Sequence, residues 1–185
     1  MDNGASSYRR FLEGDDNGFA SIIDEYMDGL LFYLNSLVSD IHIAEDLTED
    51  TFVKIITKKP RFAGRSSFKT WLYAIGRNTA IDYLKKKTKC NLIPLQDCVQ
   101  ISDDEISLEL SYIREERKII VHRALKRLRP EYRQIIWLIY FEGFNNKEAS
   151  VIMKKSIHNI ETLIYRARRS LKSELEKEGF VYEES

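Results

Sequence analysis

The sequence has little cysteine and no long apolar run, and each shortage excludes a class of protein. The two cysteines, Cys90 and Cys98, make neither a disulfide framework nor the spacing of a zinc site. The longest nearly apolar run, residues 29–38, is interrupted by Asn35 and covers about half of a bilayer crossing. Because the N-terminus is acidic and polar, we expect no secretory signal, no membrane insertion and a cytoplasmic location.

Motifs of the common enzyme classes are also missing. The sequence has no glycine-rich phosphate loop and no H-E-x-x-H motif. Residues 66–69 fit S-x-x-K, but the companion motifs S-D-N and K-T-G do not occur. His42 and Glu45 could share a helix face, although a metal site needs more ligands than these. We therefore expect a protein that is not an enzyme, with no catalytic residues, no metal and no cofactor.

What the sequence does contain is helical periodicity, interrupted by only three prolines. Apolar residues recur at steps of three and four after the possible caps at 15–17, and no strand alternation appears. Later caps are Ser66 or Ser67, a capping box of Asn145 with Glu148, and Ser156. This pattern predicts an all-α fold, with helices at about 19–37, 43–57, 68–87, 106–129, 130–141, 146–153 and 157–177.

Residues 88–104 lose this periodicity, which predicts a linker between two small helical domains. The 17 residues contain Pro94 and both cysteines, and they could span at most about 60 Å. The surrounding block, residues 90–116, has 7 acidic and 1 basic side chains. We therefore predict one domain over residues 1–87, a flexible acidic linker over 88–104, and a second domain over 105–185.

Charge is strongly segregated along the chain, although the formal net charge is zero. Residues 1–53 have 12 acidic and 2 basic side chains, whereas residues 54–89 have 11 basic and 1 acidic. Residues 117–172 have 14 basic and 4 acidic side chains. A phosphate backbone responds to local charge, so two basic blocks favour contact with nucleic acid. The acidic first block favours a protein partner instead.

The C-terminal block has the pattern of a helix-turn-helix. A short helix and a three-residue turn near Lys154 precede a second helix whose apolar residues, from Ile157 to Leu171, form one stripe. The opposite face starts with short polar groups, which can reach base edges, and continues with cations, which can neutralise phosphates. Plain helix packing is the alternative, and the basic flank that includes Arg129 and Arg133 favours DNA.

The N-terminal basic block interleaves cations with aromatic side chains. This combination suits unpaired DNA, because cations follow phosphates while rings stack on exposed bases. We expect Phe68 and Trp71 to lie in the core and Tyr73 to be more exposed than Trp71. Asn78 lies in the middle of a predicted helix, where it could bond the backbone or read a base edge.

Four segments together resemble a bacterial sigma-70 family factor, and the two-domain length is similar to the extracytoplasmic-function (ECF) group. They are AEDLTEDTF (44–52), RFAGRSSFKTWLYAIGRNTAIDYLKKK (61–87), LKRLRPEYRQIIWLIYFEGF (125–144) and KEASVIMKKSIHNIETLIYRARRSL (147–171). The resemblance implies a factor that binds core RNA polymerase, through the β′ clamp helices and the β flap, and directs initiation at promoter DNA. It also implies a sigma region 2 domain, a sigma region 4 domain, and an anti-sigma factor as a further partner.

The resemblance also implies residue roles. Contact with the β′ clamp helices falls to Asp46, Leu47, Glu49, Thr51 and Phe52. Capture of the melted −10 strand falls to Arg61, Phe62, Arg65, Ser66, Lys69, Tyr73, Arg77, Asn78, Lys85, Lys86 and Lys87. Reading of the −35 duplex falls to Ser156, His158, Asn159, Glu161, Thr162, Tyr165, Arg166, Arg168 and Arg169.

The sequence departs from the family pattern at several positions. Glu49 and Asp50 replace the usual glutamine and glutamate, and Lys154 stands in a turn that normally contains glycine. A left-handed Lys154 would cost about 1 kcal/mol. The family usually has Lys-Ser-Arg in the recognition helix, and here Glu161 replaces the lysine and Leu163 replaces the arginine. Glu161 could accept a hydrogen bond from cytosine.

Two other readings remain open from the residues alone. A helix-turn-helix repressor or activator would use the second basic block but leave the first without a role. A polymerase-binding or sigma-binding protein with no DNA contact would explain neither basic block. Transcription with purified core polymerase distinguishes them, since only a sigma factor confers promoter-specific initiation.

Overall fold

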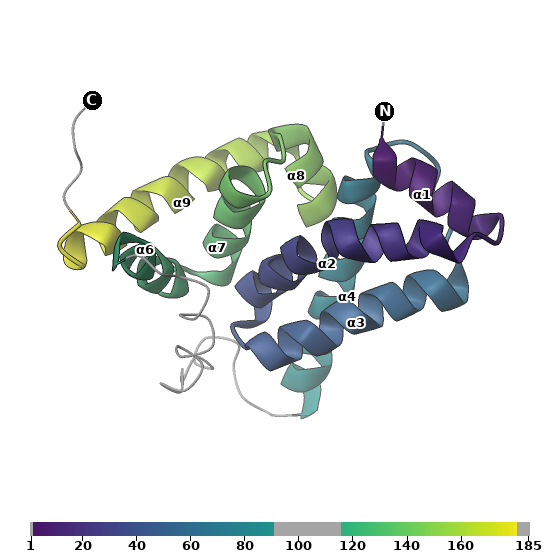
Figure 1. Ribbon diagram of the computed structural model, residues 1–185. Helices are drawn as coiled ribbons and strands as arrows, with labels where there is room; N and C mark the ends of the chain where they lie inside the picture. The colour runs from purple at the N-terminus through teal and green to yellow at the C-terminus, as the bar shows by residue number, and fades with distance from the viewer. Residues whose placement is uncertain (1, 91–115, 181–185) are drawn as a thin grey trace.

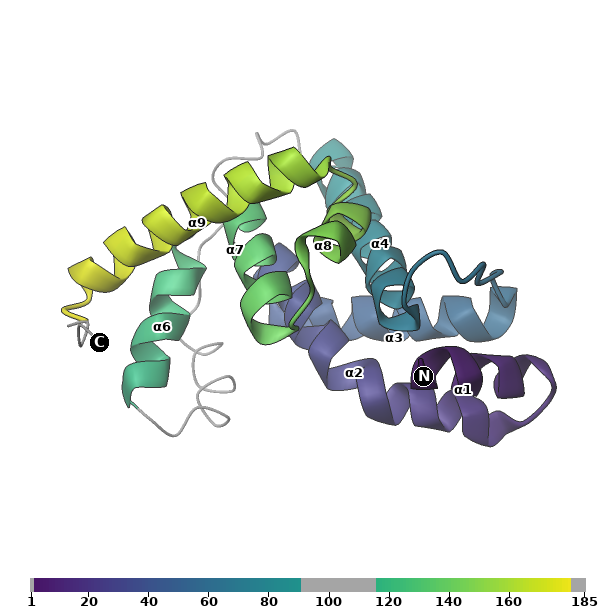
Figure 2. The same cartoon turned by 90° about the horizontal axis from the view of Figure 1, so that it is seen from above.

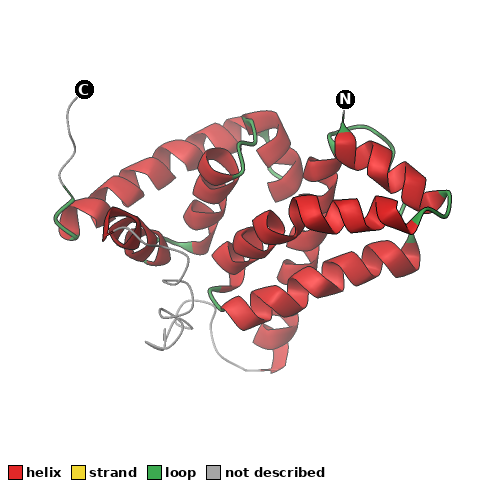
Figure 3. Ribbon diagram, in the orientation of Figure 1, coloured by secondary structure: helices red, strands yellow, loops and turns green. Residues whose placement is uncertain are grey.

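The computed structural model describes residues 2–90 and 116–180, and all the regular secondary structure in these ranges is helical (Figures 1–3). The first four helices are α1 (Asn3–Leu12), α2 (Asp16–Val38), α3 (Ile41–Lys58) and α4 (Phe68–Cys90). The C-terminal helices are α6 (Glu116–Lys126), α7 (Pro130–Ile136), the π-helix η1 (Trp137–Phe141), α8 (Asn146–Met153) and α9 (Ile157–Lys177). The predicted all-α fold is confirmed.

Local sequence signals set most of the helix ends. Asp15 and Asp40 cap α2 and α3 with their side chains, and α3 stops where Lys59 turns left-handed before Pro60. The capping box of Asn145 with Glu148 begins α8 as predicted. Aspartate and asparagine side chains thus satisfy amide groups that these helices would otherwise leave without acceptors.

Three elements differ from the prediction. Helix α1 was not predicted, because its ten residues include only a few apolar side chains. Helix α4 continues to Cys90, three residues into the predicted linker, whose remaining residues lie outside the described ranges. The helix predicted over 130–141 is α7 followed by the wider turn of η1. The start predicted near 106 for the preceding helix also lies outside the described ranges.

An aromatic cluster forms the core of the N-terminal helices. Phe68, which is fully buried, lies with its ring centre 5.3–5.7 Å from those of Tyr8, Tyr26, Phe62 and Trp71. The Tyr8 hydroxyl also donates to the Pro60 carbonyl oxygen at 2.7 Å. Helix α1 therefore stabilises the loop that precedes α4.

Helices α6 to α9 form a second group that packs directly on the first (Figures 1 and 2). Helix α8 lies against α4, and α7 lies against α2. One hydrophobic cluster runs through both groups, with Tyr73 of α4 making an edge contact with Phe144 at 5.0 Å. Among the helices that the structure describes, none has the length and apolar character to cross a membrane.

Candidate DNA and polymerase interfaces

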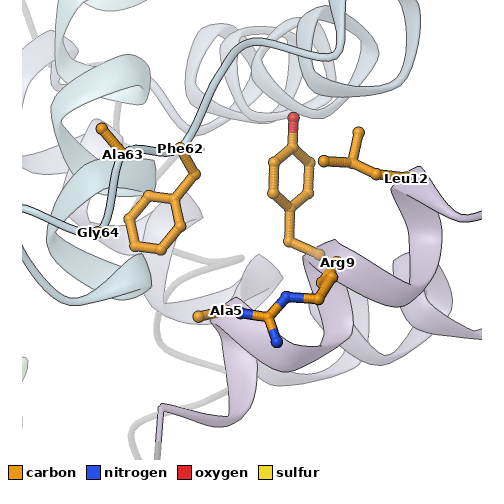
Figure 4. Close-up of a pocket in the computed structure, with 7 residues that line it drawn as sticks. Ala5, Arg9, Leu12, Phe62, Ala63 and Gly64 are labelled. Atoms are coloured by element: carbon orange, nitrogen blue, oxygen red, sulfur yellow. The ribbon is translucent and has the colours of Figure 1, made fainter.

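A pocket of about 310 Å³ lies between α1 and the loop before α4 (Figure 4). The loop contributes Phe62, Ala63 and Gly64, and α1 contributes Ala5, Tyr8, Arg9 and Leu12. A ring and a guanidinium group thus line one opening, beside the exposed side chains of Arg61 and Arg65. This combination can stack an unpaired base and attract a phosphate at the same place. Ser66, a little further along the loop, is partly buried.

Tyr73 corrects one prediction, because it is fully buried whereas Trp71 is only partly buried. Its ring stacks on that of Tyr33 at 5.4 Å, and its hydroxyl donates to Glu142 Oε2 at 2.6 Å. Burial raises the pKa of Tyr73 well above its usual value, and the neighbouring Glu142 carboxylate raises it further. The hydroxyl is therefore a stable donor, and the ring is closed to solvent in this arrangement.

The remaining −10 candidates on α4 fall into two environments. Lys69 and Arg77 are partly buried and face the C-terminal helices, where Arg77 Nε donates to Gln134 Oε1 at 3.3 Å. Asn78 is also partly buried. Lys85, Lys86 and Lys87 are exposed near the end of α4, so they can meet phosphates directly.

Helix α3 divides the polymerase candidates into exposed and buried residues. Asp46 and Glu49 are exposed, whereas Leu47, Thr51 and Phe52 are buried against the core and stabilise the helix. Two residues that the sequence reasoning missed, Val53 and Ile56, are 53% and 41% exposed. The steps from 46 to 49, 53 and 56 are three, four and three residues, which places these four side chains along one face of α3. This face of α3 thus presents two carboxylates and two apolar side chains to solvent.

Helices α8 and α9 form the predicted helix-turn-helix. The turn contains Lys154, which adopts the left-handed conformation with φ 53° that the family usually gives to glycine. Ser156 accepts from the Asn159 amide at 3.2 Å and so begins α9. Thr162 is partly buried, with Oγ1 donating to the His158 carbonyl oxygen at 3.0 Å. The other −35 candidates are exposed: Ser156, His158, Asn159, Glu161, Tyr165, Arg166, Arg168 and Arg169.

The inner face of α9 differs from the predicted stripe at two positions. Ile160 and Ala167 are fully buried as expected, but Ile157 is 46% exposed. Leu163, at a position where the family usually has a cation, is buried instead. This helix therefore has one fewer charge to offer DNA, and one more side chain in the core.

Arg133 is a further correction, because it was expected to extend the basic flank. It is buried at 5% exposure, where its Nε donates to the Ser36 carbonyl oxygen at 2.6 Å. Its terminal nitrogen donates to Ser39 Oγ at 2.5 Å. Arg133 consequently joins α7 to the end of α2 and does not contribute to a phosphate-binding surface here.

Comparisons with known proteins agree with this arrangement. A model of sigma-70 region 2 matches residues 22–90, and a model of sigma-70 region 4 matches residues 118–171. The chain is 34% identical over 158 residues to the ECF RNA polymerase sigma factor SigM of Bacillus subtilis (strain 168), covering 82% of this chain and 91% of that protein.

Solved structures give the same fold. The sigma factor RpoE of Bartonella quintana, in complex with the anti-sigma factor NepR, has a TM-score of 0.68 and 24% identity, over 85% of this chain and 96% of that one. CnrH, in complex with the cytosolic domain of CnrY, has a TM-score of 0.63 and 21% identity, over 95% and 96% of the two chains. The chain belongs to the sigma-70 family, in its extracytoplasmic-function group.

Proposed function

We propose that three surfaces of this sigma factor divide the work of promoter recognition. The outer face of α3 binds core polymerase, α9 reads the −35 duplex, and the loop with α4 holds the opened −10 strand. The observation that carries this proposal is the presence of both region 2 and region 4 on one chain, each bearing a basic surface. A regulator that only binds duplex DNA would not need region 2, so a helix-turn-helix regulator is not favoured.

The proposed role is non-enzymatic and belongs to the cytoplasm, where core polymerase and promoter DNA are found. No group of three or more His, Cys, Asp or Glu side chains that could hold a metal occurs within residues 2–90 and 116–180. The similar structure of RpoE is a complex with the anti-sigma factor NepR, which supports such a protein as a further partner of this chain.

The experiment that tests the function is transcription with purified core polymerase that lacks its own specificity subunit. Adding this chain to core polymerase and a pool of genomic fragments is expected to give RNA with discrete 5′ ends, identified by sequencing. Reactions without the chain serve as the control. Binding of the chain to DNA without any new start site would instead indicate the regulator.

Replacing Lys85, Lys86 and Lys87 together with glutamine is expected to weaken binding to all DNA sequences alike. The logarithm of the binding constant for a single strand falls linearly with the logarithm of the salt concentration. Losing three phosphate contacts should make this slope less steep by about 2. The measurement is fluorescence anisotropy of a labelled mixed-sequence oligonucleotide with holoenzyme across a salt series. Lys177→Gln is the control, because Lys177 is exposed and lies outside both basic blocks, and it should leave the slope unchanged.

Changes in the first turns of α9 are expected to alter sequence preference. Asn159→Ala and Thr162→Ala should each relax discrimination at one or two base positions of the −35 element, since a good base contact contributes about 1–3 kcal/mol. Selection from a randomised duplex library with holoenzyme measures this. Arg168→Gln is the contrasting variant, because a phosphate contact should weaken all sequences equally. An unchanged sequence preference in both Asn159→Ala and Thr162→Ala would contradict the assignment of α9 as the recognition helix.

A further inference from the structure

One apolar side chain is exposed at the start of the recognition helix. Ile157, the first residue of α9, is 46% exposed, whereas Ile160 and Ala167 of the same helix are fully buried. Single exposed apolar residues are common on protein surfaces, so exposure alone assigns no role to Ile157. Its position is informative, because the first residues of a recognition helix are those that reach base edges in the major groove.

The distribution of charge along α9 indicates which part of the helix enters the groove. Residues 156–165 contain no lysine or arginine, and the first such residue of the helix is Arg166. From Arg166 to Lys172 the cations are frequent, and all of them are exposed. Cations make the electrostatic contacts with phosphate, so these contacts fall to the later turns of α9. The first turns, which include Ile157, then lie over base edges.

The residue one turn after Ile157 supports this placement. Glu161 follows Ile157 by four positions, so the two side chains are neighbours on the same face of α9. Glu161 is exposed, and its carboxylate would be repelled by a phosphate group. The face that bears Ile157 and Glu161 is therefore suited to contact with base edges and unsuited to contact with the DNA backbone.

The chemistry of isoleucine restricts what Ile157 can recognise. Its side chain has no polar atom, so it can distinguish bases only through an apolar contact. Of the four bases, thymine alone presents a methyl group in the major groove. Ile157 is also held ready for such a contact, because its β-branched side chain has one strongly preferred rotamer in a helix. The cap that Ser156 forms with the Asn159 amide, at 3.2 Å, fixes the backbone around it.

We propose that Ile157 is a specificity-determining residue of the −35 contact, which selects thymine at one position by covering its C5-methyl group. This inference rests on the proposed function, because it takes α9 to be the helix that reads the −35 duplex. It adds a role in base recognition for a side chain that periodicity assigns to the inner stripe of the helix.

The test replaces thymine with deoxyuridine, which keeps the base pair and removes only the methyl group. Selection from a randomised duplex library with holoenzyme first gives the preferred −35 sequence of the wild-type chain. Each thymine of that sequence, on either strand, is then replaced in turn. One replacement is expected to weaken binding of holoenzyme about fourfold, which corresponds to about 0.8 kcal/mol for one buried methyl group. Competition between labelled and unlabelled duplexes measures the ratio.

Two variants determine whether Ile157 causes that difference. Ile157→Ala is expected to bind the thymine and deoxyuridine duplexes equally, because most of the side chain that covers the methyl group is then missing. Val151→Ala is the matched control, since Val151 is 47% exposed on α8, outside the recognition helix. This control should keep the fourfold difference. Circular dichroism checks that both variants retain their helix content.

Equal binding of the thymine and deoxyuridine duplexes by the wild-type chain at every position would overturn the proposal. A preferred −35 sequence that contains no thymine would also overturn it. A fourfold difference that persists in Ile157→Ala would do the same, since another side chain would then cover the methyl group. In all three cases the chain still selects a −35 sequence, so the proposed function stands. If the library yields no preferred −35 sequence, the proposed function fails and this inference fails with it.

Discussion

Phe68→Ala is expected to lower the free energy of unfolding by about 3–5 kcal/mol, the usual cost of removing a fully buried ring. Phe68 contacts four other aromatic side chains, contributed by α1, α2, the loop and α4. Because those neighbours are themselves held by helices, the site cannot collapse to fill the cavity. Urea denaturation followed by circular dichroism measures the change.

The same substitution is expected to loosen the loop that lines the pocket. Phe62 makes an edge contact with Phe68 at 5.7 Å, so removing Phe68 also removes one support of Phe62. Phe141→Ala is the matched control, since Phe141 is 52% exposed and its main ring contact is with Trp137 at 4.4 Å. That control should cost about 1 kcal/mol. Equal losses in the two variants would show that Phe68 does not organise the core.

Helix positions could be predicted from the sequence because their signals are local. Asp15, Asn145 and Ser156 each cap a helix that begins directly after them, and the structure has all three caps. Helix α1 also has a local cap, because the Asp2 carboxylate accepts from the Ala5 amide at 3.2 Å, but much of what stabilises this helix comes from distant residues. The Asp2 carboxylate accepts from the Phe68 amide at 2.6 Å, across 66 positions of the chain.

The positions of the site residues could be predicted only in part. Periodicity on one helix shows which residues share a face, but not which face a neighbouring domain covers. Spacing predicts that Tyr73 is more exposed than Trp71, because nothing in the sequence indicates that Phe144 and Glu142 cover it. Arg133 was assigned to a basic surface for the same reason, although α2 supplies its buried acceptors. Both errors lie at the contact between the domains.

Polymerase binding should depend on the two exposed apolar residues of α3. Val53→Ala with Ile56→Ala removes five carbons, worth about 0.8 kcal/mol each when fully buried. Because both side chains are about half exposed in the free chain, the contact recovers roughly half of this on binding. The expected loss is about 2 kcal/mol, or about 30-fold weaker binding to core polymerase.

Titration of labelled core polymerase with the chain measures that affinity, with urea denaturation to check that the double variant stays folded. Met27→Ala is the matched control, because Met27 is 38% exposed on α2, outside the α3 face. It should leave the affinity unchanged. If the double variant binds core polymerase as tightly as the wild-type chain, then the acidic side chains beside Val53 and Ile56 make the contact without them. The α3 face would in that case act by charge alone, and binding would weaken steeply with added salt.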